Sequence, residues 1–135
     1  MRIGTMVGDT LRSLFKKPAT EAYPFERRPT PERTRGMLKW DPDKCTGCGL
    51  CVKDCPANAL ELIVVDRKAK RFVMRWHEDA CIYCGQCVQV CRFDSIHLPP
   101  DEWELAATGR EGFTKTYGNE DDIKQAMDAL AERND

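Results

Sequence analysis

Two short cysteine runs decide the fold of this chain. The first reads CTGCGLCVKDCP over residues 45–56, and the second reads CIYCGQCVQVCR over residues 81–92. Each cysteine of the first run recurs 36 residues later in the second, and small Ala59 corresponds to Ser95 at the same offset. Such a repeat indicates an internal duplication and predicts a fold with pseudo-two-fold symmetry.

The spacing within each run suits an iron–sulfur cluster. Three thiolates within seven residues can bind three corners of one 4Fe-4S cubane, which leaves its fourth iron without a local ligand. In two-cluster ferredoxins the fourth cysteine of each run binds the other cluster. The sequence therefore predicts two 4Fe-4S clusters, and we expect cluster insertion to be coupled to folding.

The predicted ligands form two sets, each of which draws on both runs. Cluster one is assigned to Cys45, Cys48, Cys51 and Cys91. Cluster two is assigned to Cys81, Cys84, Cys87 and Cys55. Glycines in the loops allow positive φ and close approach of backbone N–H groups to sulfur, and they are Gly47, Gly49 and Gly85.

Zinc and disulfide bonds are the alternatives for these eight cysteines. Zinc sites are built from two separated CxxC pairs and have no use for a third cysteine at the same spacing. The first 18 residues lack the apolar core and cleavage site of a secretory signal. We therefore expect a reducing compartment, where metal ligation is the commoner use of cysteine.

The surrounding segments predict an α+β fold of the bacterial two-cluster ferredoxin type. Residues 37–40 and 96–98 are short apolar pieces that can pair as outer strands. Residues 60–65 and 72–76 are rich in β-formers and predict a hairpin around the polar turn 67–70. Two short helices complete the expected domain, and we interpret the aromatic residues near the clusters as packing that excludes water.

Charge divides the chain into three predicted parts: residues 1–36, 37–98 and 99–135. The formal charge is +5 over residues 1–40 and −6 over residues 99–135, although the whole chain carries only −1. Such asymmetry predicts that the two ends meet different surroundings, and two solvated faces are the alternative.

The N-terminal part predicts an amphipathic helix followed by an extended arm. Ile3, Val7, Leu11 and Leu14 recur at helical spacing, and the basic end of the helix over residues 1–17 suits an anionic membrane surface or an acidic groove. A helix folded back on the core is the alternative. Residues 18–36 carry four prolines and four arginines, which indicates an arm that docks on a partner or a disordered linker.

The C-terminal part predicts an acidic extension with a short helix. Asn119 can cap this helix, and Ile123, Met127 and Leu130 are expected to line one face of it. Acidic residues at its start suit the positive end of the helix dipole. The helix serves as a docking element or is a frayed tail, and the sequence leaves both open.

The cysteine runs, together with LRSLFKKP at 11–18, Tyr23-Pro24 and Arg35-Gly36, resemble a known family. It is the two-cluster iron–sulfur subunit shared by respiratory complex I and the membrane-bound, energy-converting NiFe hydrogenases, including formate hydrogenlyase. The resemblance covers about residues 7–107. It implies that the helix and arm lie along a membrane arm and a catalytic subunit, while the clusters relay electrons.

Two features bear on the branch of this family. The stretch WELA at 103–106 resembles the hydrogenase and formate hydrogenlyase branch, although the further C-terminal cysteines of that branch are missing. Arg92 stands where proline usually follows the last cysteine. Its guanidinium would raise the potential of cluster one or bind a partner carboxylate, and a neutral replacement is the alternative.

The resulting prediction is an electron-relay subunit of a membrane-associated oxidoreductase, preferably an energy-converting NiFe hydrogenase. The alternatives are the equivalent subunit of a complex I-type NADH-quinone oxidoreductase, a free soluble ferredoxin, and a non-redox interaction module. No catalytic site is apparent, because His77 and His97 are the only histidines and read as strand or surface residues. We expect other subunits as partners, no nucleic acid, and a cytoplasmic location attached peripherally to the inner face of the cell membrane.

Overall fold

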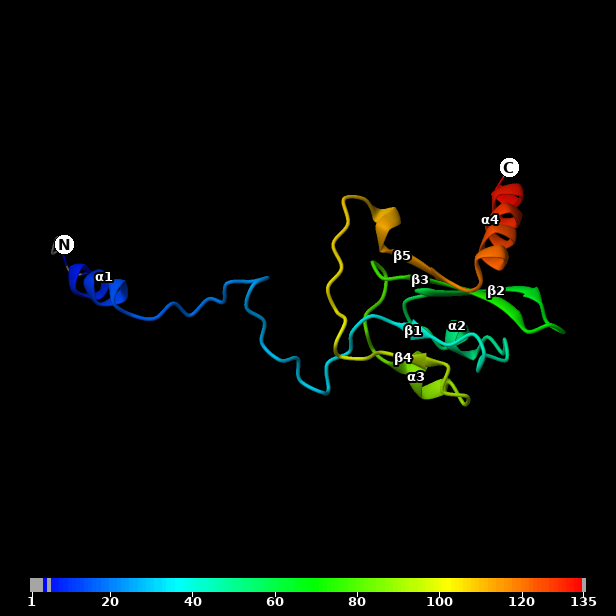
Figure 1. Ribbon diagram of the computed structural model, residues 1–135, viewed down its shortest axis with the longest axis horizontal. Coiled ribbons are helices and arrows are strands. Elements are labelled where there is room, and N and C mark those ends of the chain that lie inside the picture. Colours follow the sequence, from blue (N-terminus) through cyan, green and yellow to red (C-terminus); the bar gives the residue numbers. More distant parts are fainter. Residues whose placement is uncertain (1–3, 5, 135) are drawn as a thin grey trace.

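The protein combines two small antiparallel sheets with short helices (Figure 1), which is a mixed helix and sheet architecture. The computed structural model describes Gly4 and residues 6–134, so Ile3 of the predicted N-terminal helix lies outside the described residues. The elements follow in the order α1 (Val7–Leu14), β1 (Lys39–Trp40), α2 (Leu50–Lys53), β2 (Leu60–Asp66), β3 (Arg71–His77), α3 (Gln86–Val90), β4 (Ile96–His97), η1 (Arg110–Phe113), β5 (Thr114–Tyr117) and α4 (Glu120–Asn134).

The smaller sheet joins the segments that flank the two cysteine runs. β1 pairs antiparallel with β4, so that Lys39 lies opposite His97 and Trp40 lies opposite Ile96. This is the pairing of outer strands that the sequence predicts. The chain before the first run is thereby held against the chain after the second, which closes the domain around both runs.

The predicted hairpin forms two strands of the larger sheet. β2 and β3 pair from Leu60 opposite Trp76 to Asp66 opposite Arg71, with a bulge before Asp66. In the turn, the Asp66 carboxylate accepts a hydrogen bond from the backbone N–H of Lys68 at 2.8 Å. This aspartate thus stabilises the turn locally, as is common where a short acidic side chain meets free N–H groups.

The third strand of this sheet, β5, is a finding that the sequence did not predict. It pairs antiparallel with β3, with Tyr117 opposite Met74 and Thr114 opposite His77. The Tyr117 hydroxyl donates to the Leu38 carbonyl at 2.5 Å, which ties β5 to the segment before β1. Four residues of strand-forming type are too weak a local signal, so the pairing with β3 decides the conformation.

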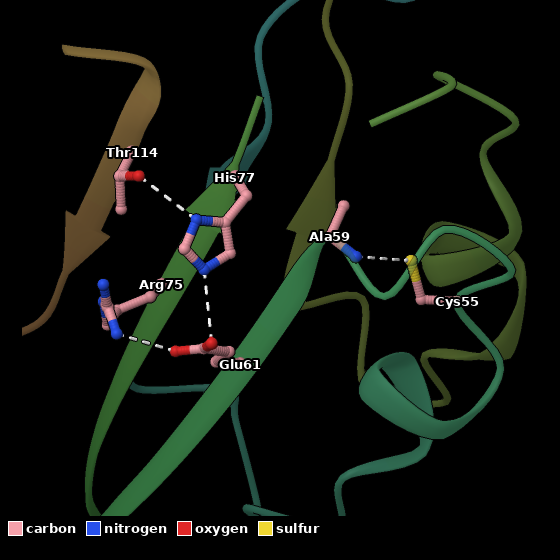
Figure 2. A network of polar contacts seen from close by, with 6 residues as sticks. All are labelled: Cys55, Ala59, Glu61, Arg75, His77 and Thr114. Atoms are coloured by element: carbon pink, nitrogen blue, oxygen red, sulfur yellow. Dashed lines mark hydrogen bonds and ion pairs between the residues drawn. The ribbon is translucent and has the colours of Figure 1, made fainter. Parts of the chain in front are cut away.

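A polar network crosses the three strands of the larger sheet (Figure 2). The Glu61 carboxylate accepts a hydrogen bond from Arg75 Nη1 at 2.8 Å and lies 3.3 Å from His77 Nε2. The other ring nitrogen, His77 Nδ1, lies 3.1 Å from Thr114 Oγ1. His77 is therefore a strand residue that links β2, β3 and β5, in agreement with its interpretation from the sequence.

Helix α4 packs on the larger sheet through a face that partly matches the predicted one. Asp122 and Ala126 are buried and Ile123 and Leu130 are half-buried, whereas Met127 of the expected face is 44% exposed. The reason is an ion pair: Arg71 Nε at the start of β3 donates to the Asp122 carboxylate at 2.5 Å. The pairing turns Asp122 toward the sheet, while Glu120 and Asp121 stay exposed.

The hydrophobic core lies between the strands and the cysteine loops. Trp76 and Met74 of β3 are fully buried, and Ile96 of β4 and Leu38, which directly precedes β1, pack with them. Burying a side chain of this size stabilises a fold by about 1.5–3 kcal/mol. Cys45 and Cys51 belong to the same cluster of buried residues, so the core and the cysteine loops form one unit.

The N-terminal segment differs from the rest of the chain, because α1 stands apart from the other elements in Figure 1. No residue of α1 is buried, and Leu11 is 54% exposed. The arm that follows is anchored at its end by Gly36, whose N–H donates to the Pro99 carbonyl at 3.1 Å. A Cβ at Gly36 would lie 2.2 Å from that carbonyl oxygen, so only glycine permits the close approach.

Candidate metal centres

Two hollows in the protein are lined by the eight cysteines. The first hollow is lined by Cys45, Cys48, Cys51 and Cys91. The second hollow is lined by Cys55, Cys81, Cys84 and Cys87. Three cysteines of each set come from one run and the fourth from the other, so the structure brings together each of the two sets named from the sequence.

The remaining walls of the two hollows correspond as closely as the cysteines do. Every residue that lines the first hollow stands 36 positions from a residue that lines the second. The non-cysteine pairs are Thr46 and Ile82, Gly49 and Gly85, Leu50 and Gln86, Leu62 and Leu98, Met74 and Leu38, Phe93 and Ala57, Ser95 and Ala59, and Ile96 and Leu60. The sequence repeat is therefore also a repeat of the chemical surroundings.

Local backbone geometry places the cysteines around these hollows. Gly49 and Gly85 precede helices α2 and α3 with left-handed φ values of 73° and 77°. This conformation costs little without a Cβ and turns the loop into the helix. Each short helix then carries its fourth cysteine, Cys55 or Cys91, away from its own loop.

Backbone amides donate to four of the sulfurs at matching positions. The pairs, with N···Sγ distances, are Gly47 to Cys45 (3.4 Å), Tyr83 to Cys81 (3.4 Å), Ala59 to Cys55 (3.3 Å, Figure 2) and Ser95 to Cys91 (3.4 Å). Such donors stabilise a thiolate, the form of cysteine that binds metal. They act in both hollows through the same loop geometry.

Burial and hydrogen bonding act in opposite directions on the thiols. Burial raises the pKa of Cys51 and of Cys87 to about 11. At Cys91 burial also acts to raise the pKa, but hydrogen bonds from the hydroxyl and N–H of Ser95 outweigh it, so the net pKa is lowered. The buried thiols need a cationic group beside them to become thiolates at neutral pH, and iron provides that charge.

One matched position differs sharply between the two loops. A Cβ at Gly47 would lie 2.3 Å from the Phe72 ring, so this position has room only for glycine. The equivalent Tyr83 instead packs edge-on against Trp76, with ring centroids 5.9 Å apart, and its hydroxyl donates to Glu78 at 2.5 Å. Burial and this hydrogen bond raise the pKa of Tyr83.

The donor set fits 4Fe-4S clusters. Among Gly4 and residues 6–134, no three His, Cys, Asp or Glu side chains stand close enough together to hold a single metal ion. The cysteines surround hollows instead, and a cubane takes one thiolate at each iron. Trp76, which lines the second hollow, has a buried Nε1 without a hydrogen-bond partner, so a sulfide-rich group would supply a suitable acceptor.

The arm contributes contacts that sequence reasoning missed. Arg35 Nη1 donates to the Tyr83 carbonyl at 2.9 Å, within the second cysteine loop. Arg27 pairs with Glu104 at 2.9 Å, and Trp103 Nε1 donates to Thr30 Oγ1 at 3.3 Å. Two of the four arginines in the arm, Arg27 and Arg35, thus bind the chain itself, which no local pattern reveals because the contacts span distant residues.

Arg92, for which the sequence left a tuning role, a partner contact and a neutral replacement open, has an exposed side chain, and its role stays a prediction. The buried Ser95 lies nearer to the chemistry, with its hydroxyl 3.2 Å from Cys91 Sγ. In the sequence, Ser95 differs from Ala59 at the matched position of the repeat. This difference looks like a harmless exchange of two small residues.

None of the described helices has the length and apolar character needed to cross a membrane.

Comparison with known proteins identifies the family. A family model described as a 4Fe-4S dicluster domain matches residues 27–95. The NAD(P)H-quinone oxidoreductase subunit I of Synechococcus elongatus is 41% identical over 64 residues, which cover 47% of this chain and 30% of that protein. The chloroplastic subunit I of Hordeum vulgare is 42% identical over 64 residues, which cover 47% of this chain and 34% of that protein. The chain therefore spans about a third of the length of these relatives.

A solved structure matches over more of the chain. It is described as the membrane-bound sulfane sulfur reductase, an archaeal respiratory membrane complex, and it aligns with a TM-score of 0.60 at 31% identity. The alignment covers 82% of this chain and 58% of that chain. Together the matches confirm the resemblance to iron–sulfur subunits of complex I-related enzymes. With half of its residues matched by the family model, the protein belongs to the 4Fe-4S dicluster domain family, and its cofactors are two 4Fe-4S clusters.

Proposed function

We propose that this chain is an electron-relay subunit of a membrane-associated oxidoreductase related to complex I. The observation that carries the proposal is the pair of matched hollows, each lined by four cysteines drawn from both runs. The relatives named as quinone oxidoreductase subunits support the assignment to a larger enzyme. When bound, the clusters supply one-electron chemistry, for which the chain provides ligands, hydrogen bonds and exclusion of water.

We propose the ligand sets by hollow. Cys45, Cys48, Cys51 and Cys91 hold the first cluster, and Cys55, Cys81, Cys84 and Cys87 hold the second. Each set crosses between the two runs, so the two halves form a pseudo-two-fold unit in which neither cluster site is complete without the other half. This cross-linking couples folding to cofactor binding.

The walls of the hollows keep water from the reacting centres. Leu60 and Trp76 line the second hollow, Met74 and Ile96 line the first, and all four are buried. On the solvent side, Cys48 and Cys84 are exposed at equivalent positions. Each hollow therefore has one side through which an electron can pass to a neighbouring centre, while the opposite side is packed.

The N-terminal segment supports a docking role. The apolar side chains at the end of α1 are exposed, with Leu14 at 72% and the following Phe15 at 91%, and two lysines come directly after. Residues 1–17 therefore suit a partner subunit or an anionic membrane surface, and we propose peripheral attachment at the inner face of the membrane.

The hydrogenase branch stays a prediction. The prediction of this branch rested on the stretch WELA at 103–106. In the structure this stretch contacts the arm, because Trp103 donates a hydrogen bond to Thr30 and Glu104 forms an ion pair with Arg27. These contacts give the stretch a structural role in holding the arm. The matched proteins carry the names of quinone oxidoreductases and a sulfane sulfur reductase. Identification of the copurifying subunits decides the branch, and a NiFe subunit among them would establish the hydrogenase assignment.

Anaerobic purification with iron and sulfide analysis tests the cofactors. We expect about eight irons and about eight sulfides per chain, with EPR signals that appear on reduction. Zinc without sulfide would contradict the proposal and favour a structural interaction module. Washing of native membranes tests attachment, because a chain that is entirely soluble and monomeric in the native extract would favour a free ferredoxin.

A further inference from the structure

The two hollows differ by one buried hydroxyl at a matched position. Ala59 and Ser95 are 1% and 2% exposed, and their backbone N–H groups donate to the fourth cysteine of each run at 3.3 and 3.4 Å. Ser95 adds a second contact, because its Oγ lies 3.2 Å from Cys91 Sγ. Ala59 has no atom that can do this for Cys55, so the first hollow has one more hydrogen bond to sulfur.

Metal ligation decides the direction of this hydrogen bond. A free thiol could donate to the Ser95 hydroxyl, but a metal-bound thiolate has no proton and can only accept. The hydroxyl of Ser95 is therefore the donor when Cys91 is a ligand. Its burial makes the contact stronger than it would be in water, because the local dielectric is low.

A hydrogen bond to a ligand sulfur favours the state that carries more negative charge, which is the reduced state. Nearby charges do not reproduce this effect in the second hollow, because Glu78 and Arg35 bring opposite signs to the Tyr83 loop. We propose that the Ser95 hydroxyl sets the reduction potential of the first cluster above that of the second. The inference rests on the proposed ligand sets and adds an order of potentials.

The consequence is a preferred location for the electron. An electron that enters the chain rests on the centre beside Ser95, and the centre beside Ala59 is the stronger reductant.

An EPR-monitored redox titration of the anaerobically purified full chain tests the proposal. Ser95→Ala removes only the hydroxyl, and Ser95→Thr retains one. Ala59→Ser places a hydroxyl at the matched position of the second hollow. Iron and sulfide are measured for each variant, so that loss of a cluster is separated from a change in potential.

We expect Ser95→Ala to lower the higher midpoint potential and leave the lower one in place. When one hydrogen bond of ordinary strength is lost, the ratio of reduced to oxidised first cluster should fall by about three- to tenfold at the wild-type midpoint potential. Ala59→Ser is expected to raise the lower midpoint by a similar factor, and Ser95→Thr is expected to retain most of the wild-type value.

Two results would overturn the inference. If Ser95→Ala keeps both clusters but moves neither midpoint, or moves the lower one, the hydroxyl does not set the order and the proposed electron relay is unaffected. If the wild-type chain lacks iron and sulfide, the relay function fails and the inference fails with it.

Discussion

The cysteine core and the N-terminal segment are built on opposite principles. In the core, Trp76 and Met74 are fully buried, and strands from both ends of the domain pack against the cysteine loops. In the N-terminal segment, α1 has no buried residue, and Phe15 is 91% exposed. The core is therefore stabilised by its own contacts and cofactors, whereas α1 has apolar surface that only another molecule can cover.

The C-terminal extension belongs with the core in this comparison. β5 adds a strand to β3, and α4 buries Asp122 against Arg71. An acidic tail and a basic arm look alike as solvated flanks in the sequence, yet one is part of the sheet and the other is attached through a few contacts with the loops. The difference shows that charge runs at the two termini have separate physical roles.

The strongest test of the core is Cys91→Ser. We expect loss of the cluster in the hollow of Cys45, Cys48 and Cys51, with about four irons and four sulfides remaining instead of eight. The reciprocal variant Cys55→Ser should remove the other cluster. EPR spectra of the two variants should show complementary signals. If Cys91→Ser removes the cluster of its own loop, the crossed ligand sets are wrong.

A smaller effect is expected for Asp122→Ala, which tests whether α4 belongs to the core. Removal of this carboxylate leaves Arg71 without its partner, and we expect a loss in the free energy of unfolding that exceeds the loss from an exposed substitution. Arg71 is 40% exposed, so water partly replaces the carboxylate and limits the loss. The measurement is denaturant unfolding of the cluster-loaded chain.

The matched control for this variant is Asp121→Ala at the exposed neighbouring position, which should change stability by less than about 0.5 kcal/mol. Equal losses for the two variants would show that α4 is not packed through Asp122.

The junction between the two regions is tested by Gly36→Ala. The new Cβ would clash with the carbonyl oxygens of Pro99 and Glu102, so we expect a strain of about 1–3 kcal/mol. The expected readout is faster proteolysis of the arm with unchanged iron and sulfide content. Gly109→Ala, where no atom lies within 4 Å of the added Cβ, is the control. Unchanged proteolysis in Gly36→Ala would mean that this contact does not hold the arm.

The smallest effect on stability is expected for Leu11→Gln combined with Leu14→Gln. Both side chains are already exposed, so the free energy of unfolding should change by less than about 0.5 kcal/mol. Attachment to membranes or copurifying subunits should fall strongly, as measured by pelleting of native extracts. Ser13→Gln alters a polar position of the same helix and should leave attachment intact. If the double variant stays attached, α1 is not the docking element.

The sequence by itself determined the features that depend on local spacing. The 36-residue repeat named both sets of four cysteines, because a loop, a glycine and one helical turn fix where each thiol can reach. Two runs rich in β-forming residues around a polar turn likewise predicted the β2–β3 hairpin. The family resemblance came from motifs that can be read along the chain.

Only the tertiary structure decided the features that depend on contacts between distant residues. The strand β5 forms because it pairs with the free edge of β3. Asp122 of α4 lies toward the sheet because it pairs with Arg71. Arg92 was the residue beside Cys91 that the sequence brought forward, whereas the structure shows that the hydroxyl in contact with Cys91 belongs to Ser95. A hydrogen bond depends on position within a few tenths of an ångström, and the order of residues alone does not contain that information.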